Sequence, residues 1–376
     1  MLLPILLMLL PAPQSEPAPG PFTIPVVDLD SRDEFHVVVD REDGQYLGHP
    51  TTLLLEDGMT LLCVYPKGHG KGGIVYKRST DGGATWSERL PTPENWTTSR
   101  EVPTLHRVVD AAGKKRVIMW SGLYPARLAV SEDDGLTWSD LKPVGDWGGI
   151  VVMGCVVTLS KPGHYMAMFH DDGRFLTKEP QRTKPVTFKL LKTISTDGGL
   201  TWSNPETIWQ GSDIHLCEPG HLWSPDGKTL AVFLRENARR RNSQVIFSTD
   251  DGATFSAPRE LPAALTGDRH TGTRLPDGRY FLSFRDRSPG AWKSPTEGDW
   301  VGWVGTWSDL VGGREGEYRI RLKDNHHAWD CAYPGVEQLP DGTVVTTTYG
   351  HWDPGQSPYI RTVRFRIGQL DALVSR

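Results

Sequence analysis

The stretch STDGGATWS at residues 79–87 decides the fold of this chain, because close copies of it occur three more times. The copies are SEDDGLTWS at 131–139, STDGGLTWS at 195–203 and STDDGATFS at 248–256. All four have Ser first, Asp third, Gly fifth, Thr seventh and an aromatic residue eighth, and their starts lie 52, 64 and 53 residues apart. Spacing of this order is typical of an array in which one supersecondary unit repeats.

The residue types of this motif predict a tight hairpin turn. Strand-like runs precede it, such as GGIVYKR before the first copy and RLAVS in the second. The Asp can accept hydrogen bonds from N–H groups of the turn, while the Gly two positions later adopts a positive φ. The aromatic side chain can then pack against the neighbouring unit. Because four equivalent turns cannot all face one site, we expect a structural role, rather than catalysis or metal binding, for Asp81, Asp133, Asp197 and Asp250.

The motif is the Asp-box, and its spacing resembles that of the blades of sialidase-like six-bladed β-propellers. With copies about 50 residues apart, this resemblance implies about six four-stranded antiparallel blades over residues 21–376. The repeats start with the strand FHVVVD at 35–40, and a decayed box is expected at TWSDL, residues 306–310. Long helices are not expected, since no segment keeps an apolar period of 3.6 residues. We therefore predict an all-β, six-bladed β-propeller with Asp-box turns.

The N-terminus and the composition restrict where the protein works. Residues 1–10 are almost entirely apolar and are followed by PAPQSEPAPGP, so we interpret 1–20 as a signal peptide or a disordered N-terminal segment. A secreted or periplasmic protein is expected, and ten apolar residues are too few to span a bilayer. A net charge of −5 gives no reason to expect nucleic acid or an anionic membrane as partner. We expect a monomer with buried free thiols at its cysteines, Cys63, Cys155, Cys217 and Cys331.

Two further segments resemble sialidases and imply a catalytic pair. The segment CEP at 217–219, followed by PDGKTLAVFLRE, is similar to the family segment in which a Glu precedes a hairpin and an Arg follows it. The match implies that Glu218 polarises the nucleophile and that Arg235 binds the substrate carboxylate. The segment YPGVEQLPDGTVVTTTYG resembles the family segment that begins with the nucleophile, which implies this role for Tyr333.

A tyrosine nucleophile suits a substrate that is itself acidic. Sialic acid carries a carboxylate at its anomeric carbon, so a neutral phenol paired with Glu avoids the repulsion that an anionic nucleophile would meet. Sialidases are accordingly an exception to the two-carboxylate rule of glycosidases. Arg235 and Arg285 each follow an apolar strand run and are predicted to bind the substrate carboxylate, with Arg287 as the alternative to Arg285. The run at 239–241 is interpreted as solvated arginines.

The chain departs from the sialidase pattern in its first unit. His49 precedes Pro50 where the family has an Arg, and Lys67, Gly68 and His69 stand where it has a second Arg and an acid/base Asp. Three alternatives follow. The protein cleaves sialosides with His49 or Lys67 helping to bind the carboxylate and another group as the acid, it hydrolyses a different acidic sugar, or it binds glycans without cleaving them.

The general acid is the least determined role. Candidates are His69, His270 and the pair Asp171 and Asp172 in FHDDGRF, although HDDG is also typical of a simple hairpin turn. We assign Asp172 as catalytic and place His69 and His270 with His49 and Lys67 among the substrate-binding residues.

No cofactor or metal site is predicted. The loop KGHGKGG lacks the order of a P-loop. His326 and His327 lie near Asp330, and His351 lies near Asp353, but neither group has a spacing typical of a metal site. From these observations we expect an exo-acting, retaining glycoside hydrolase that releases terminal sialic acid, or a related acidic sugar, from glycoconjugates.

Overall fold

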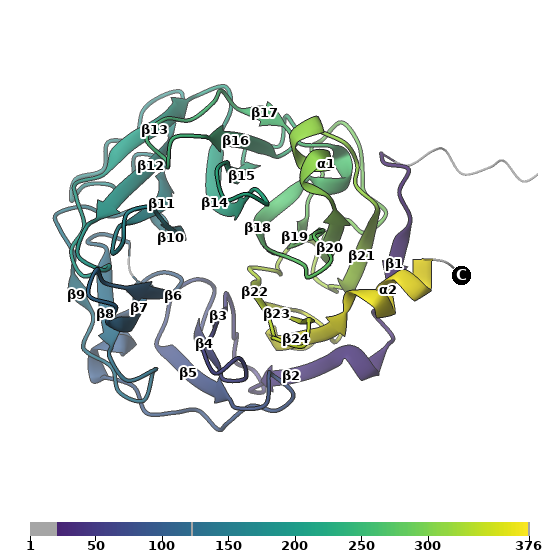
Figure 1. The fold of residues 1–376 in the computed structure, drawn as a ribbon, viewed down its shortest axis with the longest axis horizontal. Helices are drawn as coiled ribbons and strands as arrows, with labels where there is room; N and C mark the ends of the chain where they lie inside the picture. Colours follow the sequence, from purple (N-terminus) through teal and green to yellow (C-terminus); the bar gives the residue numbers. More distant parts are fainter. Residues whose placement is uncertain (1–20, 122, 375–376) are drawn as a thin grey trace, which may run out of the picture.

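A computed structural model describes residues 21–121 and 123–374, so the predicted signal segment 1–20 lies outside the described residues. The strands of the described part form six sheets that surround a central axis (Figure 1). Within each repeat the first strand lies nearest the axis and the later strands follow outward. The predicted six-bladed β-propeller is therefore confirmed.

The blades follow the chain in order and are antiparallel within each repeat. Blade 1 consists of β3 (Thr51–Leu54), β4 (Leu61–Pro66) and β5 (Ile74–Ser79). Blade 2 consists of β6 (Thr104–Val109), β7 (Lys115–Ser121), β8 (Arg127–Ser131) and β9 (Lys142–Pro143). Blade 3 consists of β10 (Ile150–Thr158), β11 (Tyr165–Asp171), β12 (Phe188–Ser195) and β13 (Glu206–Gly211).

The second half of the chain repeats this arrangement. Blade 4 consists of β14 (Leu216–Trp223), β15 (Leu230–Glu236), β16 (Gln244–Ser248) and β17 (Arg259–Glu260). Blade 5 consists of β18 (Gly267–Arg274), β19 (Tyr280–Asp286), β20 (Trp300–Gly305) and β21 (Tyr318–Lys323). Blade 6 takes from the C-terminal repeat β22 (Gly335–Gln338), β23 (Thr343–Gly350) and β24 (Tyr359–Arg366).

The N-terminal strands close the ring. β2 (His36–Asp40) pairs antiparallel with β24, so it is the outermost strand of blade 6 and not part of the first repeat. β1 (Val26–Asp28) adds a parallel strand to β21 at the outer edge of blade 5. The strand FHVVVD thus forms as predicted, but it joins the two ends of the chain instead of opening blade 1. This pairing holds the last blade to the first.

The Asp-boxes are turns, as predicted. In the first box, the Ser79 hydroxyl donates to Asp81 (2.8 Å) and accepts from the Gly83 N–H (2.8 Å). Asp81 also accepts from the N–H (2.9 Å) and hydroxyl (2.6 Å) of Thr85. Gly83 has φ +80°, which an L side chain rarely adopts. The boxes at Ser131, Ser195 and Ser248 repeat the bonds from Ser to Asp and from Thr to Asp.

The aromatic residues of the boxes pack between blades. Trp138 of blade 2 lies with its ring 6.0 Å from the ring of Tyr76 in blade 1. Trp202 of blade 3 lies 5.1 Å from Trp120 in blade 2. Each box therefore turns its own hairpin and also supplies apolar contact to the preceding blade.

Helices are few and short in the described residues, as expected. They are α1 (Trp307–Gly312), α2 (Ile367–Val374) and the 3-10 turns η1 (Asp33–Phe35), η2 (Glu94–Thr98) and η3 (Ala263–Leu265). The expected decayed box at 306–310 is wrong, because Thr306 and Asp309 form a capping box that starts α1. All four cysteines are free and buried, which confirms their prediction. Among the described residues, no helix is both long and apolar enough to cross a membrane.

The inner ends of the blades share a backbone irregularity that positions the site. The register is interrupted in the innermost strands β10, β14 and β18. Non-glycine residues with positive φ occur at this end of five blades: His49 (50°), Val151 (43°), Glu218 (52°), Arg269 (56°) and Ala332 (53°). Such irregularities cost free energy, re-aim side chains and concentrate beside functional sites.

We expect Asp133→Ala to lower the free energy of unfolding by about 1 to 3 kcal/mol, because Ser131 and Thr137 lose their acceptor. Asp140→Ala removes an exposed carboxylate from the same hairpin and is the matched control. Urea unfolding monitored by tryptophan fluorescence measures both variants. Equal stability of Asp133→Ala and wild type would contradict the structural role of the boxes.

Candidate active site

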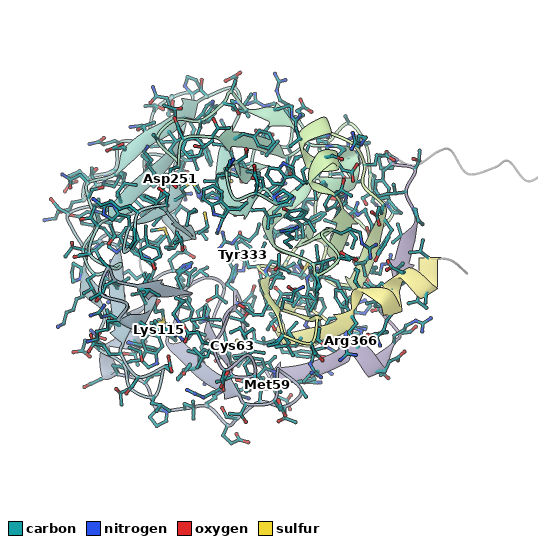
Figure 2. All side chains as sticks on the ribbon, in the orientation of Figure 1. Met59, Cys63, Lys115, Asp251, Tyr333 and Arg366 are labelled. Atoms are coloured by element: carbon teal, nitrogen blue, oxygen red, sulfur yellow. The ribbon has the colours of Figure 1, made fainter. Side chains whose placement is uncertain are left out.

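A buried tyrosine and a buried glutamate meet near the propeller axis. Tyr333 lies directly before β22 and close to the centre of the ring (Figure 2). Its hydroxyl donates to Oε1 of Glu218 at 2.5 Å, and the side chains come from blades 6 and 4. Both residues are less than a tenth exposed. The Tyr333 N–H donates to the Thr348 hydroxyl (2.8 Å), which fixes the backbone at this point.

The pair consists of a neutral phenol and a charged carboxylate. Burial raises the pKa of Tyr333 well above its ordinary value, and the negative charge of Glu218 adds to this. Burial also opposes ionisation of Glu218, but Arg235, Arg285 and the hydrogen bond from Tyr333 outweigh it and hold the pKa of Glu218 below its ordinary value. A phenol beside a base that is already deprotonated is prepared to act as a nucleophile.

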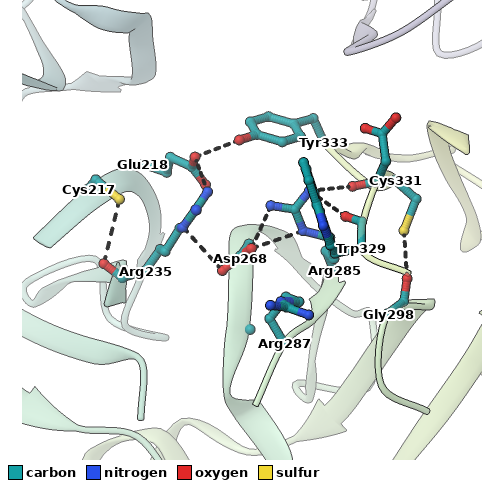
Figure 3. A network of polar contacts seen from close by, with 12 residues as sticks. Cys217, Glu218, Arg235, Asp268, Arg285, Arg287, Gly298, Trp329, Cys331 and Tyr333 are labelled. Atoms are coloured by element: carbon teal, nitrogen blue, oxygen red, sulfur yellow. Dashed lines mark hydrogen bonds and ion pairs between the residues drawn. The ribbon is translucent and has the colours of Figure 1, made fainter. Parts of the chain in front are cut away.

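Arg235 joins this pair to a second buried carboxylate, Asp268 (Figure 3). Its Nη1 donates to Oε1 of Glu218 at 2.7 Å, and its Nε lies 3.4 Å from Asp268. Asp268 is fully buried and binds two more arginines. Arg239 donates to both of its oxygens (2.6 and 2.7 Å), and Arg285 donates twice to Oδ2 (2.9 and 2.6 Å).

The three arginines keep Asp268 ionised and are themselves held in place by it. Burial would raise the pKa of Asp268, but Arg235, Arg239 and Arg285 hold it well below the ordinary value. The interpretation of Arg239 as a solvated arginine is therefore wrong. Sequence alone could not show this contact, because Asp268 belongs to the next blade.

Arg285 is also bound to the segment that carries Tyr333. Its Nη1 donates to the carbonyl oxygens of Trp329 (2.8 Å) and Cys331 (3.2 Å). The Arg285 side chain is 4% exposed, whereas those of Arg235 and Arg239 are 18% and 22% exposed. Arg287, the alternative, pairs with Glu297 at 3.1 Å. Binding of a substrate carboxylate by Arg235 and Arg285 stays a prediction.

Two of the predicted histidines lie near Tyr333, because His49 contacts its ring and His69 contacts His49. The ring of His49 is 4.5 Å from that of Tyr333, and its Nδ1 accepts from the Gly70 N–H at 3.1 Å. Burial holds the pKa of His49 well below its ordinary value, so the ring is neutral. His69 lies 4.7 Å from His49, and its side chain is 55% exposed. Its Nδ1 is 2.7 Å from the Tyr46 hydroxyl.

The other predicted residues make their polar contacts elsewhere. Lys67 forms an ion pair with Glu42 at 2.9 Å. His270 is buried between Phe233 and Phe284, and its Nε2 is 2.9 Å from the carbonyl oxygen of Leu265.

The HDDG segment forms a turn beside the site. Asp171 accepts hydrogen bonds from the N–H groups of Gly173 and Phe175. Asp172 is 2% exposed in its side chain and accepts from Arg174 at 2.8 Å. The segment still borders the pair of Tyr333 and Glu218, because the N–H of Glu218 donates to Nδ1 of His170 at 3.3 Å. The role of Asp172 stays a prediction.

Glu101 is a candidate that the sequence analysis missed. It lies before the inner strand of blade 2 and accepts a hydrogen bond from the N–H of Val102 at 3.0 Å. Burial raises the pKa of Glu101 to about 7, and the negative charge of Glu218 adds to the shift. The sequence EVP at 101–103, which places Glu before an inner strand as CEP does at 217–219, was the available signal.

Comparison with known proteins identifies the family of the repeats. The model of the BNR repeat-like domain matches residues 114–345. A sialidase from Micromonospora viridifaciens is 26% identical over 226 residues, which cover 51% of this chain and 33% of that protein. The chain thus spans about a third of the length of this curated relative.

Solved structures show the same fold. A protein of unknown function from Dyadobacter fermentans superimposes with a TM-score of 0.67 at 17% identity, covering 88% of this chain and 97% of that one. The intramolecular trans-sialidase from Ruminococcus gnavus gives 0.57 at 15% identity, covering 86% and 95%. A sialidase from Streptococcus pneumoniae gives 0.59 at 12% identity, covering 89% and 71%.

The repeat pattern, the blade architecture and the family match lead to the same assignment. The chain belongs to the BNR repeat-like domain family and is a divergent member of the sialidase superfamily.

Proposed function

We propose that this protein is an exo-acting glycoside hydrolase of the sialidase type, which releases a terminal sialic acid or a related acidic sugar with retention of configuration. The observation that carries the proposal is the 2.5 Å hydrogen bond from the Tyr333 hydroxyl to Glu218, with Arg235 at 2.7 Å from the same oxygen. A structural tyrosine would not need a buried base from another blade beside it. Such a pair provides an activated nucleophile.

In the first step Tyr333 attacks the anomeric carbon as its phenolic proton passes to Glu218. A bond forms between the phenolic oxygen and the sugar, and the bond to the leaving oxygen breaks with its electron pair. The leaving oxygen takes a proton from a general acid. In the second step water attacks the anomeric carbon, the water proton returns to the general acid, and Tyr333 leaves with the proton held by Glu218. Two displacements at one carbon give overall retention.

The charges around the pair support an acidic substrate. Arg235, Arg239 and Arg285 carry three positive charges, against the negative charges of Glu218 and Asp268. Arg235 and Arg239 are the more exposed of the three, so they are the groups that a sugar carboxylate can reach. A neutral nucleophile avoids repulsion by that carboxylate.

We assign the general acid to Glu101. An acid for this step must carry a proton near neutral pH, and burial raises the pKa of Glu101 to about 7. Asp172, the sequence-based candidate, already accepts from Arg174 in an ion pair at 2.8 Å. His69, a second candidate, is exposed and hydrogen-bonded to Tyr46.

One observation favours glycan binding without turnover as the second candidate function. His49 and Lys67 stand where the family has arginines, but His49 is neutral and Lys67 is paired with Glu42. These two side chains therefore do not replace the missing positive charges. A hydrolase for a different acidic sugar is the third alternative, and the same site would serve it.

Tyr333→Phe should lower kcat on an aryl α-sialoside by at least about three orders of magnitude, because the covalent intermediate cannot form. Glu218→Gln should lower it by about two to four orders of magnitude, because the phenol loses its base. Fluorophore release measures both. Tyr318→Phe removes a hydroxyl from outer strand β21 and is the matched control.

Undiminished activity of Tyr333→Phe would exclude this nucleophile. The wild-type protein could also be inactive on the aryl α-sialoside and on other aryl glycosides of acidic sugars. If it then binds sialosides in calorimetry, this result would support the binding function instead.

Glu101→Gln should lose activity on a natural sialoside, whose poor leaving group needs a proton, and should keep most of its activity on an activated aryl sialoside. In wild type, activity on the natural substrate should fall as the pH rises through about 7, because Glu101 then loses its proton. This alkaline limb should be missing in Glu101→Gln with the activated substrate. Asp172→Asn, measured in parallel, should not show this dependence on the leaving group. The opposite pattern would move the assignment to Asp172.

A further inference from the structure

Three side chains with metal-binding atoms come together near Tyr333, although the sequence analysis placed His351 apart from His327 and Asp330. His327 and Asp330 lie in the segment between β21 and β22, and His351 directly follows β23. One ligand atom from each residue lies within 4.8 Å of the other two. The fold therefore creates a site of two imidazoles and one carboxylate, which local spacing in the sequence did not reveal.

The cluster is held in place by the backbone and by other side chains. Asn325 accepts from the N–H of His351 (3.0 Å) and donates to the carbonyl oxygen of His327 (2.9 Å), so it joins the two histidine segments. The two imidazole rings stack with centroids 4.4 Å apart. Oδ2 of Asp330 lies 3.0 Å from Nε2 of His351. This arrangement aligns three donors before any ion binds.

Asp330 also has the outer partners that a metal-binding carboxylate needs. The Tyr46 hydroxyl donates to it at 2.9 and 3.0 Å, and the Tyr349 hydroxyl donates at 3.1 Å. Partners of this kind orient a ligand and tune its affinity. The cluster remains open on one side, because His327 is exposed and the neighbouring Trp329 is 45% exposed.

We propose that His327, Asp330 and His351 bind one divalent transition metal ion, with Zn²⁺ as the best-fitting ion. Imidazole and carboxylate are both zinc ligands, and a mixed nitrogen and oxygen set disfavours Ca²⁺ and Mg²⁺. Three protein ligands leave a coordination position free for water or a substrate oxygen.

The position of the cluster gives this ion a role in the proposed function, and this step rests on that function. Tyr349 links Asp330 (3.1 Å) to Nε2 of His49 (3.2 Å), and the His49 ring lies 4.5 Å from that of Tyr333. The ion would thus lie on the side of Tyr333 where His49 replaces an arginine of the sialidase pattern. It supplies there a fixed positive charge for the substrate carboxylate.

Zinc binding by the full, untagged chain tests the site independently of activity. The protein is dialysed against a chelator and titrated with Zn²⁺ in a calorimeter, and the bound metal is counted after gel filtration. We expect one Zn²⁺ per chain. His327→Ala should weaken binding by more than about tenfold, since loss of an outer partner alone costs about that much. His326→Ala removes the exposed neighbouring imidazole and should bind as wild type does.

Equal binding by wild type and His327→Ala, or no zinc bound by wild type, would overturn the site. Turnover of an aryl α-sialoside with and without Zn²⁺ tests the role. We expect a lower KM in the presence of the ion, with a smaller change in kcat. Zinc that binds without changing KM would overturn the role and leave the site. Zinc binding without any turnover of acidic sugars would overturn the proposed function and leave the metal site.

Discussion

The site depends on the burial of one negative charge, that of Glu218, close to the propeller axis. An unpaired carboxylate in this position would be strongly disfavoured, since burial removes its hydration. Here Oε1 of Glu218 accepts from both Tyr333 and Arg235. Oε2 is buried and has no hydrogen-bond partner among the described residues, so part of the cost is not offset within the protein. Such an unsatisfied group is typical of a site where function, and not stability, selects the residue.

The same constraint extends to the next blade. Arg235 balances Glu218, but it is itself partly buried, and Asp268 balances it in turn. Asp268 then fixes Arg239 and Arg285, and Arg285 holds the carbonyl oxygens of Trp329 and Cys331 directly before Tyr333. The network thus connects Glu218 to the segment that carries Tyr333 through blades 4, 5 and 6. Rigid positioning of this kind is needed when a proton transfer and a bond formation occur together.

The scaffold and the site carry different kinds of strain. The Asp-box turns satisfy their own hydrogen bonds, and where φ is positive they have glycine or, at Asp134 and Asp251, an aspartate, which tolerates this conformation. They therefore stabilise the hairpins at low cost. At the inner strands the positive φ falls on His49, Glu218 and Arg269 instead. A side chain at positive φ carries a conformational cost, and at Glu218 and Arg269 it coincides with an irregularity in the strand register. The outer turns stabilise the hairpins of the blades, and the irregular inner strands carry residues of the candidate site.

The sequence by itself determined the repeat, the box turns, the six blades and the pairing of Tyr333 with Glu218. The turns follow from a local pattern, since a box closes within nine residues, and the number of blades and the pair follow from segments that resemble those of a known family. Only the tertiary structure decided which blade β2 completes, which arginines bind Asp268, that burial raises the pKa of Glu101, and that His327, Asp330 and His351 meet. Each of these depends on contacts between blades or on burial, which arise from closure of the ring and leave little trace in local spacing.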